Sequence, residues 1–203
     1  MVTEGEEALL PAGGHVLTSG DDYGYRPVEG RRKVLLWSRR PWRSPDTVGD
    51  PALPPGRYAA GTTRAPGGDV RVVGVCVPWR DAHVRTGRRD RAAWVDHLAY
   101  LAPLGSLLAR ERAAHGRLVV AGDLNQRIPR RRQPVVVAAA LERALEGLAV
   151  VTAGQGCEGR DLIDHVAVAP PPGGACRVTC LPRGGPDGRS SDHDAVVVDL
   201  PAG

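Results

Sequence analysis

Three short polar segments hold the side chains best suited to chemistry, and each adjoins an apolar run. Asp123 and Asn125 follow one such run, Asp164 lies inside a second, and Asp192 and His193 precede a third. Side chains at the ends of rigid strands project into loops, where binding and catalytic sites usually form. Each segment alone is a weak signal. The three together are far more specific.

The first segment has two interpretations. Asp and Asn dominate turns, so Asp123 and Asn125 could simply shape the turn after a strand. If the strand continues instead, positions i and i+2 point the same way, and both side chains could address one target.

The other two segments place titratable side chains where they would need a partner of opposite charge or a hydrogen-bond donor. Within LIDHVAV, Asp164 is costly to bury unless it meets a cation or a hydrogen-bond donor. The alternative is an edge-strand Asp in water. Strand alternation turns His165 away from Asp164, so the two should not share a role. His193 titrates near neutral pH and is a natural contact for a phosphate, and a carboxylate partner would favour its charged form. A polar turn is the alternative for its segment.

The elements that must position these residues are mostly strands, with two helices between them. Apolar runs predict strands at His15–Ser19, 32–38, 117–121, 148–152, 162–168 and 195–200, and a hairpin of 57–64 and 70–77. Helical spacing predicts helices over 90–114, bent or interrupted at Pro103, and over 134–147. Residues 41–56 are expected to form an exposed loop. This order favours an α/β (α+β) fold with two packed sheets covered by helices.

Composition indicates one domain spanning residues 1–203. The net charge is +4 and the pI is near 9.2, a mild bias toward polyanionic partners. No run approaches the roughly 18 apolar residues of a membrane span, and the acidic start is unlike a signal peptide. We therefore expect a cytoplasmic protein. Its four cysteines are interpreted as reduced structural thiols, because the Cys176–Cys180 spacing is weak evidence for zinc.

In this order, VVAGDLN, LIDHVAV and SSDHDAVVV resemble the three C-terminal motifs of the endonuclease/exonuclease/phosphatase superfamily. The resemblance covers nearly the whole chain and implies a DNase I-like, four-layer sandwich of two mainly antiparallel sheets flanked by helices. It also implies a divalent-metal phosphoester hydrolase using Mg²⁺ or Mn²⁺, since hard cations prefer oxygen ligands.

The resemblance implies a role for each site residue. Asp123 would orient or deprotonate the attacking water, and Asn125 would hydrogen-bond the phosphate or that water. Asp164 would pair with His193, which would donate to a phosphate oxygen. Asp192 would join the metal site directly or through water.

The N-terminal part departs from the family pattern. The metal should also have a Glu at the end of an early strand, and Glu4 is the best candidate, with Glu6 and Glu7 nearby. A solvated acidic terminus is the alternative. The family's first strand and its active-site Asn should precede this Glu, so we expect either a true start that lies upstream or an N-terminally shortened member that lacks one edge strand.

Two further positions bear on the substrate. Where the family usually offers a Tyr or His, this sequence has Cys76, and His83 could replace it or be a plain surface histidine. The loop after Asn125 carries an arginine cluster that could grip flanking phosphates or be simply solvated; its members are Arg127, Arg130, Arg131 and Arg132.

The leading hypothesis is a phosphodiesterase or nuclease acting on nucleic acid. One rival is a same-fold phosphatase acting on a small phosphoester such as an inositol phosphate. A second rival is a catalytically silent binding module.

Overall fold

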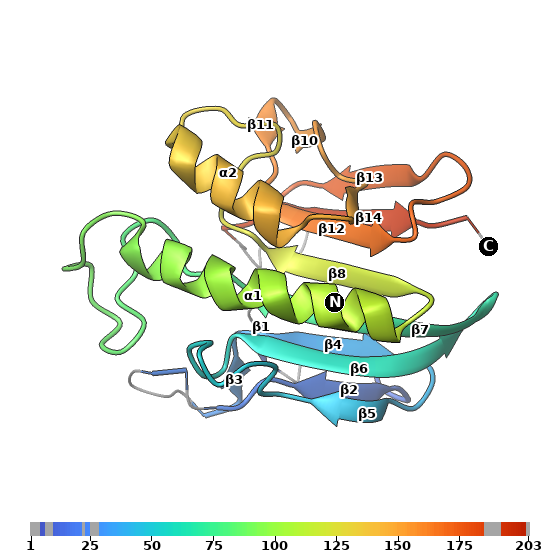
Figure 1. Cartoon of the computed structure of the whole chain (residues 1–203). Helices are drawn as coiled ribbons and strands as arrows, with labels where there is room; N and C mark the ends of the chain where they lie inside the picture. Colours follow the sequence, from blue (N-terminus) through green and yellow to red (C-terminus); the bar gives the residue numbers. More distant parts are fainter. Residues whose placement is uncertain (1–4, 7–9, 22, 25–28, 185–191, 202–203) are drawn as a thin grey trace.

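The computed structural model describes residues 5–6, 10–21, 23–24, 29–184 and 192–201. Its centre is a six-stranded sheet (Figure 1). In spatial order the strands are β5 (Arg43–Asp46), β6 (Tyr58–Ala65), β7 (Gly68–Cys76), β8 (Leu118–Asp123), β12 (Asp164–Ala169) and β9 (Ala149–Val150). Only β7 and β8 run parallel, because helix α1 (Val95–Ala114) connects them; the other pairs are antiparallel.

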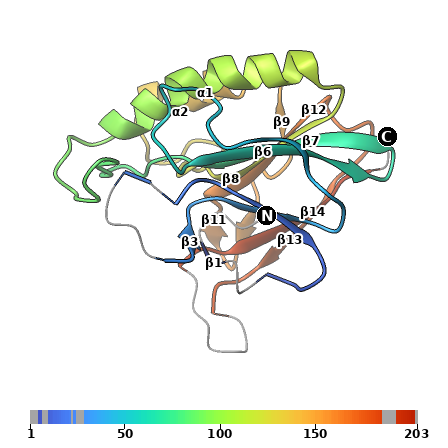
Figure 2. The same ribbon diagram turned by 90° about the horizontal axis from the view of Figure 1, so that it is seen from below.

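A second layer is built from two-stranded pairs. These are β2 (His15–Thr18) with β4 (Leu35–Ser38), β13 (Arg177–Leu181) with β14 (Ala195–Asp199), β1 (Gly5–Glu6) with β3 (Arg31–Arg32), and β10 (Gly156–Cys157) with β11 (Arg160–Asp161). Figure 2 shows α1 and α2 (Val135–Ala144) on one side of the six-stranded sheet and β13–β14 on the other. The predicted α+β class is confirmed.

Strand alternation divides the core between the two faces of the large sheet. Toward the helices, Val73 and Val75 of β7 pack with Leu104 of α1. Toward the second layer, Cys76 of β7 packs with Leu36 of β4. The large sheet is therefore covered on both faces, and a register slip of one residue would turn its buried side chains to the wrong face.

Helix α1 corrects one prediction. It begins at Val95 rather than Asp90 and continues through Pro103 to Ala114 as one element. Proline removes one helical hydrogen bond. Tyr100, three residues before this proline, and Leu104, directly after it, are completely buried in the core between helix and sheet, and this packing holds the helix together.

The prediction of a loop at 41–56 is also partly wrong, because Arg43–Asp46 forms strand β5 at the edge of the large sheet. An edge position tolerates Pro45, since the missing N–H need not pair, and the register with β6 is irregular between Arg43 and Asp46. The remaining predicted strands and the 134–147 helix are present with changed bounds: β7 and β8 are longer than predicted, β6 is shifted by one residue, and the others are shorter.

The cysteine prediction is wrong for two residues. Cys157 of β10 and Cys180 of β13 form a disulfide, while Cys76 and Cys176 are not disulfide-bonded in the described part of the chain. The cysteines are 23 residues apart in the chain and meet because β10 lies against β13. Sequence spacing could not reveal this contact. None of the helices in the described part of the chain is long and apolar enough to cross a membrane.

Candidate active site

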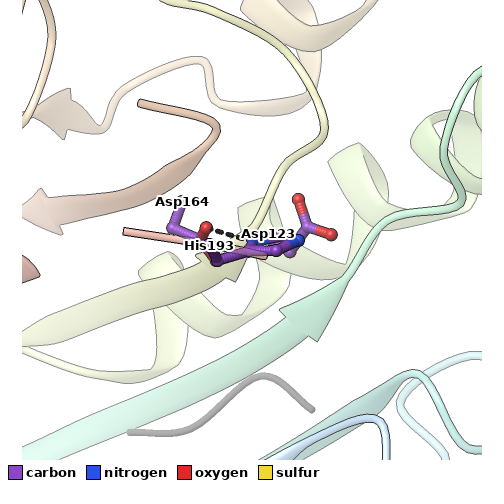
Figure 3. Close-up of side chains that lie close together, drawn as sticks. All are labelled: Asp123, Asp164 and His193. Atoms are coloured by element: carbon purple, nitrogen blue, oxygen red, sulfur yellow. Dashed lines mark hydrogen bonds and ion pairs between the residues drawn. The ribbon is translucent and has the colours of Figure 1, made fainter. Parts of the chain in front are cut away.

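The three polar segments meet at one end of the large sheet. Strands β8 and β12 pair antiparallel with Asp123 opposite Asp164, and the segment entering β14 adds His193 (Figure 3). A carboxylate oxygen from each Asp and a ring nitrogen of His193 all lie within 4.8 Å of one another. Convergence from three separate strands is the arrangement expected of a site rather than of three unrelated turns.

Asp164 and His193 form a close ion pair. The Nδ1 atom of His193 lies 2.6 Å from Oδ2 of Asp164. This hydrogen bond, with the nearby carboxylates, raises the pKa of His193 to about 9, although partial burial opposes it. His193 is therefore protonated at neutral pH. Its Nδ1–H donates to Asp164, and the Asp192 carboxylate is 4.0 Å from Nε2.

Asp123 is almost completely buried, with 7% of its surface exposed. Burial and the negative charge of Asp164 raise its pKa to about 7, so it can exchange a proton near neutral pH. The preceding Gly122 allows this placement, because its φ is 151° and an added Cβ would overlap the Val75 carbonyl oxygen. Strands β7 and β8 thus approach closely where the site begins.

Asn125 lies beside Asp123, but not through the strand continuation considered above. Strand β8 ends at Asp123, and Asn125 adopts a left-handed conformation with φ 51°. Its backbone N–H donates to Asp123 Oδ1 at 2.8 Å. Its side-chain amide donates to Asp123 Oδ2 at 2.6 Å and to the Val77 carbonyl at 2.8 Å. The turn interpretation is therefore confirmed, and the turn itself places both side chains together.

A buried network that the sequence did not predict supports this turn from below. His97 of α1 donates from Nδ1 to the Pro78 carbonyl at 2.7 Å, so its Nε2 accepts from Gln126 Nε2 at 2.8 Å. Burial lowers the pKa of His97, which keeps the ring neutral as this network requires. The Gln126 amide also donates to the Val137 carbonyl at 3.0 Å. The turn is thereby joined to both helices.

His165 provides a further connection. It is buried, its Nε2 donates to the Gln126 carbonyl at 3.0 Å, and its Nδ1 accepts from Thr152 Oγ1 at 3.0 Å. As strand alternation predicts, it takes no part in the Asp164–His193 pair. The sequence offers one indication that Gln126 supports the site, namely its position directly after the D-x-N segment. His97 gave none, because its partners come from distant segments.

The other predicted site residues differ in position. Glu4 lies outside the described residues. Asp192 is at the rim of the site with its side chain 96% exposed. His83 pairs with Asp90 at 2.6 Å on the loop after β7, and it is neither in the Asp123–Asp164–His193 cluster nor among the residues lining the hollow beside it. Cys76 is buried opposite Asp123 in the sheet.

An arginine-rich hollow of about 700 Å³ opens beside the cluster, and Asp164, Asp192 and His193 line it. Arg127, Arg131 and Arg132 contribute to its wall, as do Arg160 and Arg183, which the sequence did not single out. Arg130 is not among the lining residues; its guanidinium donates to the Gln133 carbonyl at 3.3 Å. The predicted loop therefore lies at the site, with one arginine turned away.

Comparison with known proteins finds similar structures but no similar sequence family. No family model and no curated protein sequence matches the chain. It is similar to the 3'-5' exonuclease NExo from Neisseria meningitidis, with a TM-score of 0.70, 21% identity and coverage of 96% of this chain and 85% of that one. It is also similar to an AP endonuclease from Archaeoglobus fulgidus, with a TM-score of 0.66, 17% identity and coverage of 96% and 84%.

A third similar structure is sphingomyelinase C from Streptomyces griseocarneus, with a TM-score of 0.51, 14% identity and coverage of 93% and 74%. All three belong to the DNase I-like superfamily, so the chain has the DNase I-like fold. The resemblance inferred from the three motifs is confirmed at this level. Identities of this size establish the fold, and the named activities are those of the neighbours.

Proposed function

We propose that this chain hydrolyses phosphoesters with the help of Mg²⁺ or Mn²⁺, and that its substrate is nucleic acid. The observation that carries the proposal is the Asp123–Asp164–His193 cluster at the strand ends of a DNase I-like fold. It combines a carboxyl group that titrates near neutral pH with an imidazolium that can donate to a phosphate.

The oxygen-rich donor set suits a hard divalent cation. Asp192 and Glu4 are the proposed ligands, and Asp123 and Asp164 add carboxylates within reach of one another. When bound, the cation would polarise the phosphoryl oxygen and stabilise the leaving oxygen. A neighbour of this fold, a Staphylococcus aureus beta toxin, has been solved with bound magnesium ions.

The protein's own residues divide the remaining work. Asp123 orients the attacking water and accepts its proton. Both N–H groups of the Asn125 amide already donate within the protein, so Oδ1 is the atom left to meet that water. Of the two roles left open for Asn125, water orientation is therefore favoured. His193 donates from Nε2 to a phosphate oxygen, with Asp164 fixing the ring.

The test is an activity panel on purified protein with Mg²⁺ or Mn²⁺, using bis-p-nitrophenyl phosphate, plasmid DNA, RNA and an inositol phosphate. We expect turnover of the diester and DNA, and its loss in Asp123→Ala and His193→Ala. His15→Ala, an exposed histidine on β2, is the matched control and should retain activity. His83→Ala decides whether that residue contributes. No turnover above the inactive variants with any divalent metal would favour a silent binding module.

A further inference from the structure

In the arginine-rich hollow beside the Asp123–Asp164–His193 cluster, some of the arginines form ion pairs with acidic residues of the same lining. Arg131 donates twice to Asp161, at 3.0 and 3.1 Å. Arg160 donates twice to Asp194, at 3.2 and 2.8 Å. These two pairs are bidentate, the strongest arginine–carboxylate geometry. They offset the charges of two arginines and two acids in the wall of the hollow.

The guanidinium groups of two arginines in the same wall form no ion pair in the described part of the chain. Arg132 is exposed and forms no ion pair there. The guanidinium of Arg183 donates to the backbone carbonyl of Asp192 at 3.2 Å. The carboxylate that its backbone N–H contacts, Asp194, is already in a bidentate ion pair with Arg160. Arg127 is only weakly paired, 3.9 Å from Asp161. The wall therefore has a net positive charge.

This positive wall is continuous with the catalytic residues. Asp164 and His193 line the hollow together with Arg132 and Arg183. The remaining acid, Asp192, is the one assigned to the cation. An anionic group one step along the substrate from the reacting phosphate would thus meet guanidinium groups rather than carboxylates.

We propose that the hollow is a subsite for a second phosphate, adjacent to the scissile one and bound by Arg132 and Arg183. The inference rests on the proposed function and specifies its substrate as a chain of consecutive phosphodiesters. It also revises the sequence prediction, since Arg131 is occupied by Asp161 and Arg130 points away.

The first experiment compares oligonucleotides in which one linkage, on either side of the cleaved one, is a neutral methylphosphonate. We expect the native protein to prefer the charged linkage on one side by about tenfold in kcat/KM. In the Arg132→Ala/Arg183→Ala double variant this ratio should fall to near one. The ratio cancels any loss common to both substrates. Arg64→Ala, an exposed arginine on β6 outside the site, should keep the native ratio.

The second experiment measures binding without turnover, by fluorescence anisotropy of a labelled oligonucleotide in EDTA. The double variant should bind about tenfold more weakly than Arg64→Ala. Equal binding, or a native protein indifferent to the neutral linkage, would overturn the subsite while leaving hydrolysis intact. No hydrolysis of any substrate would overturn the proposed function, and anisotropy would still decide the subsite. Phosphate release from an inositol polyphosphate, lost in the double variant while oligonucleotides show no linkage dependence, would assign it to a small polyphosphate instead.

Discussion

Asp164 keeps His193 protonated across the neutral range, and this makes a sharp prediction about pH. The hydrogen bond and charge of Asp164 raise the pKa of His193 to about 9. His193 loses its proton above that pH, so kcat/KM should decline there. In Asp164→Asn the pKa should fall toward its ordinary value of about 6.5, and the basic limb of the profile should move with it. The measurement is the pH dependence of bis-p-nitrophenyl phosphate turnover, with metal-free NMR titration of His193.

The same pair should contribute to stability in a defined pH window. A raised histidine pKa stabilises the folded state fully below the unfolded pKa of about 6.5, and the contribution disappears as pH rises through about 9. The difference in melting temperature between native protein and Asp164→Asn should shrink over that interval. Asp199→Asn, an exposed Asp on β14, is the control. For the kinetic prediction, an unchanged basic limb of the kcat/KM profile in Asp164→Asn would contradict the assignment of that limb to His193.

For single residues, the sequence predicted which side chains pair better than it predicted their backbone conformations. The Asp164–His193 pair was implied by the resemblance that the three motifs carry, and it is present in the structure. The left-handed turn at Asn125 did not, because it depends on hydrogen bonds to Asp123 and to Val77, 48 residues away. The same limit explains why the Asp161 and Asp194 partners of the arginines were missed.

Among the elements, the turn after β8 depends on its connections to α1, α2 and β12. Gln126→Ala would leave His97 Nε2 and the Val137 carbonyl without their partner. We expect the free energy of unfolding to fall by about 2 kcal/mol. Because displacement of Asp123 and Asn125 misaligns the water, kcat should fall about tenfold with less change in KM. Urea unfolding and steady-state kinetics measure the two effects.

Two variants separate hydrogen bonding from packing at this turn. Gln126→Met keeps most of the side-chain volume but cannot donate, so it should behave like Gln126→Ala if hydrogen bonds hold the turn. Gln155→Ala removes an exposed Gln side chain and should leave both measurements unchanged. Native kinetics in Gln126→Met would show that the network is not a positioning device.

The disulfide joins β10 to β13, whose partner β14 directly follows His193. Closing a loop of 23 residues stabilises the fold by about 3 kcal/mol in the chain-entropy description. We expect dithiothreitol to lower the melting temperature of the native protein and to have no further effect on Cys157→Ala/Cys180→Ala. Cys176→Ala removes a free thiol and should respond to dithiothreitol like the native protein. A reductant-insensitive native protein with four titratable thiols would refute the pairing.

Elements were predictable where their apolar pattern was local. The apolar runs at 117–121 and 162–168 gave β8 and β12 because each is buried on both faces of the large sheet. Strand β5 was not predictable, since Arg43–Asp46 pairs only along an edge. Strand β13 alternates exposed and half-buried residues in a polar context and gave no apolar run.

For the whole molecule, the fold class followed from the order of strands and helices, but the location of charge required the folded chain. A net charge of +4 spread over many arginines says little. Folding places five of them around one hollow beside the Asp123–Asp164–His193 cluster, and pairs two with Asp161 and Asp194. The excess of positive charge is thus local, which has a measurable consequence in salt.

Turnover of DNA should decline steeply with ionic strength, because each phosphate contact releases counterions. With two to three contacts we expect kcat/KM on DNA to fall about tenfold between roughly 50 and 200 mM salt. Bis-p-nitrophenyl phosphate has no flanking phosphate and should change far less. In Arg132→Ala/Arg183→Ala the logarithmic slope on DNA should become shallower by about one per lost contact. Equal slopes for DNA and the small diester would instead identify a phosphatase or diesterase of small molecules, because a polyanionic substrate cannot bind this wall without displacing ions.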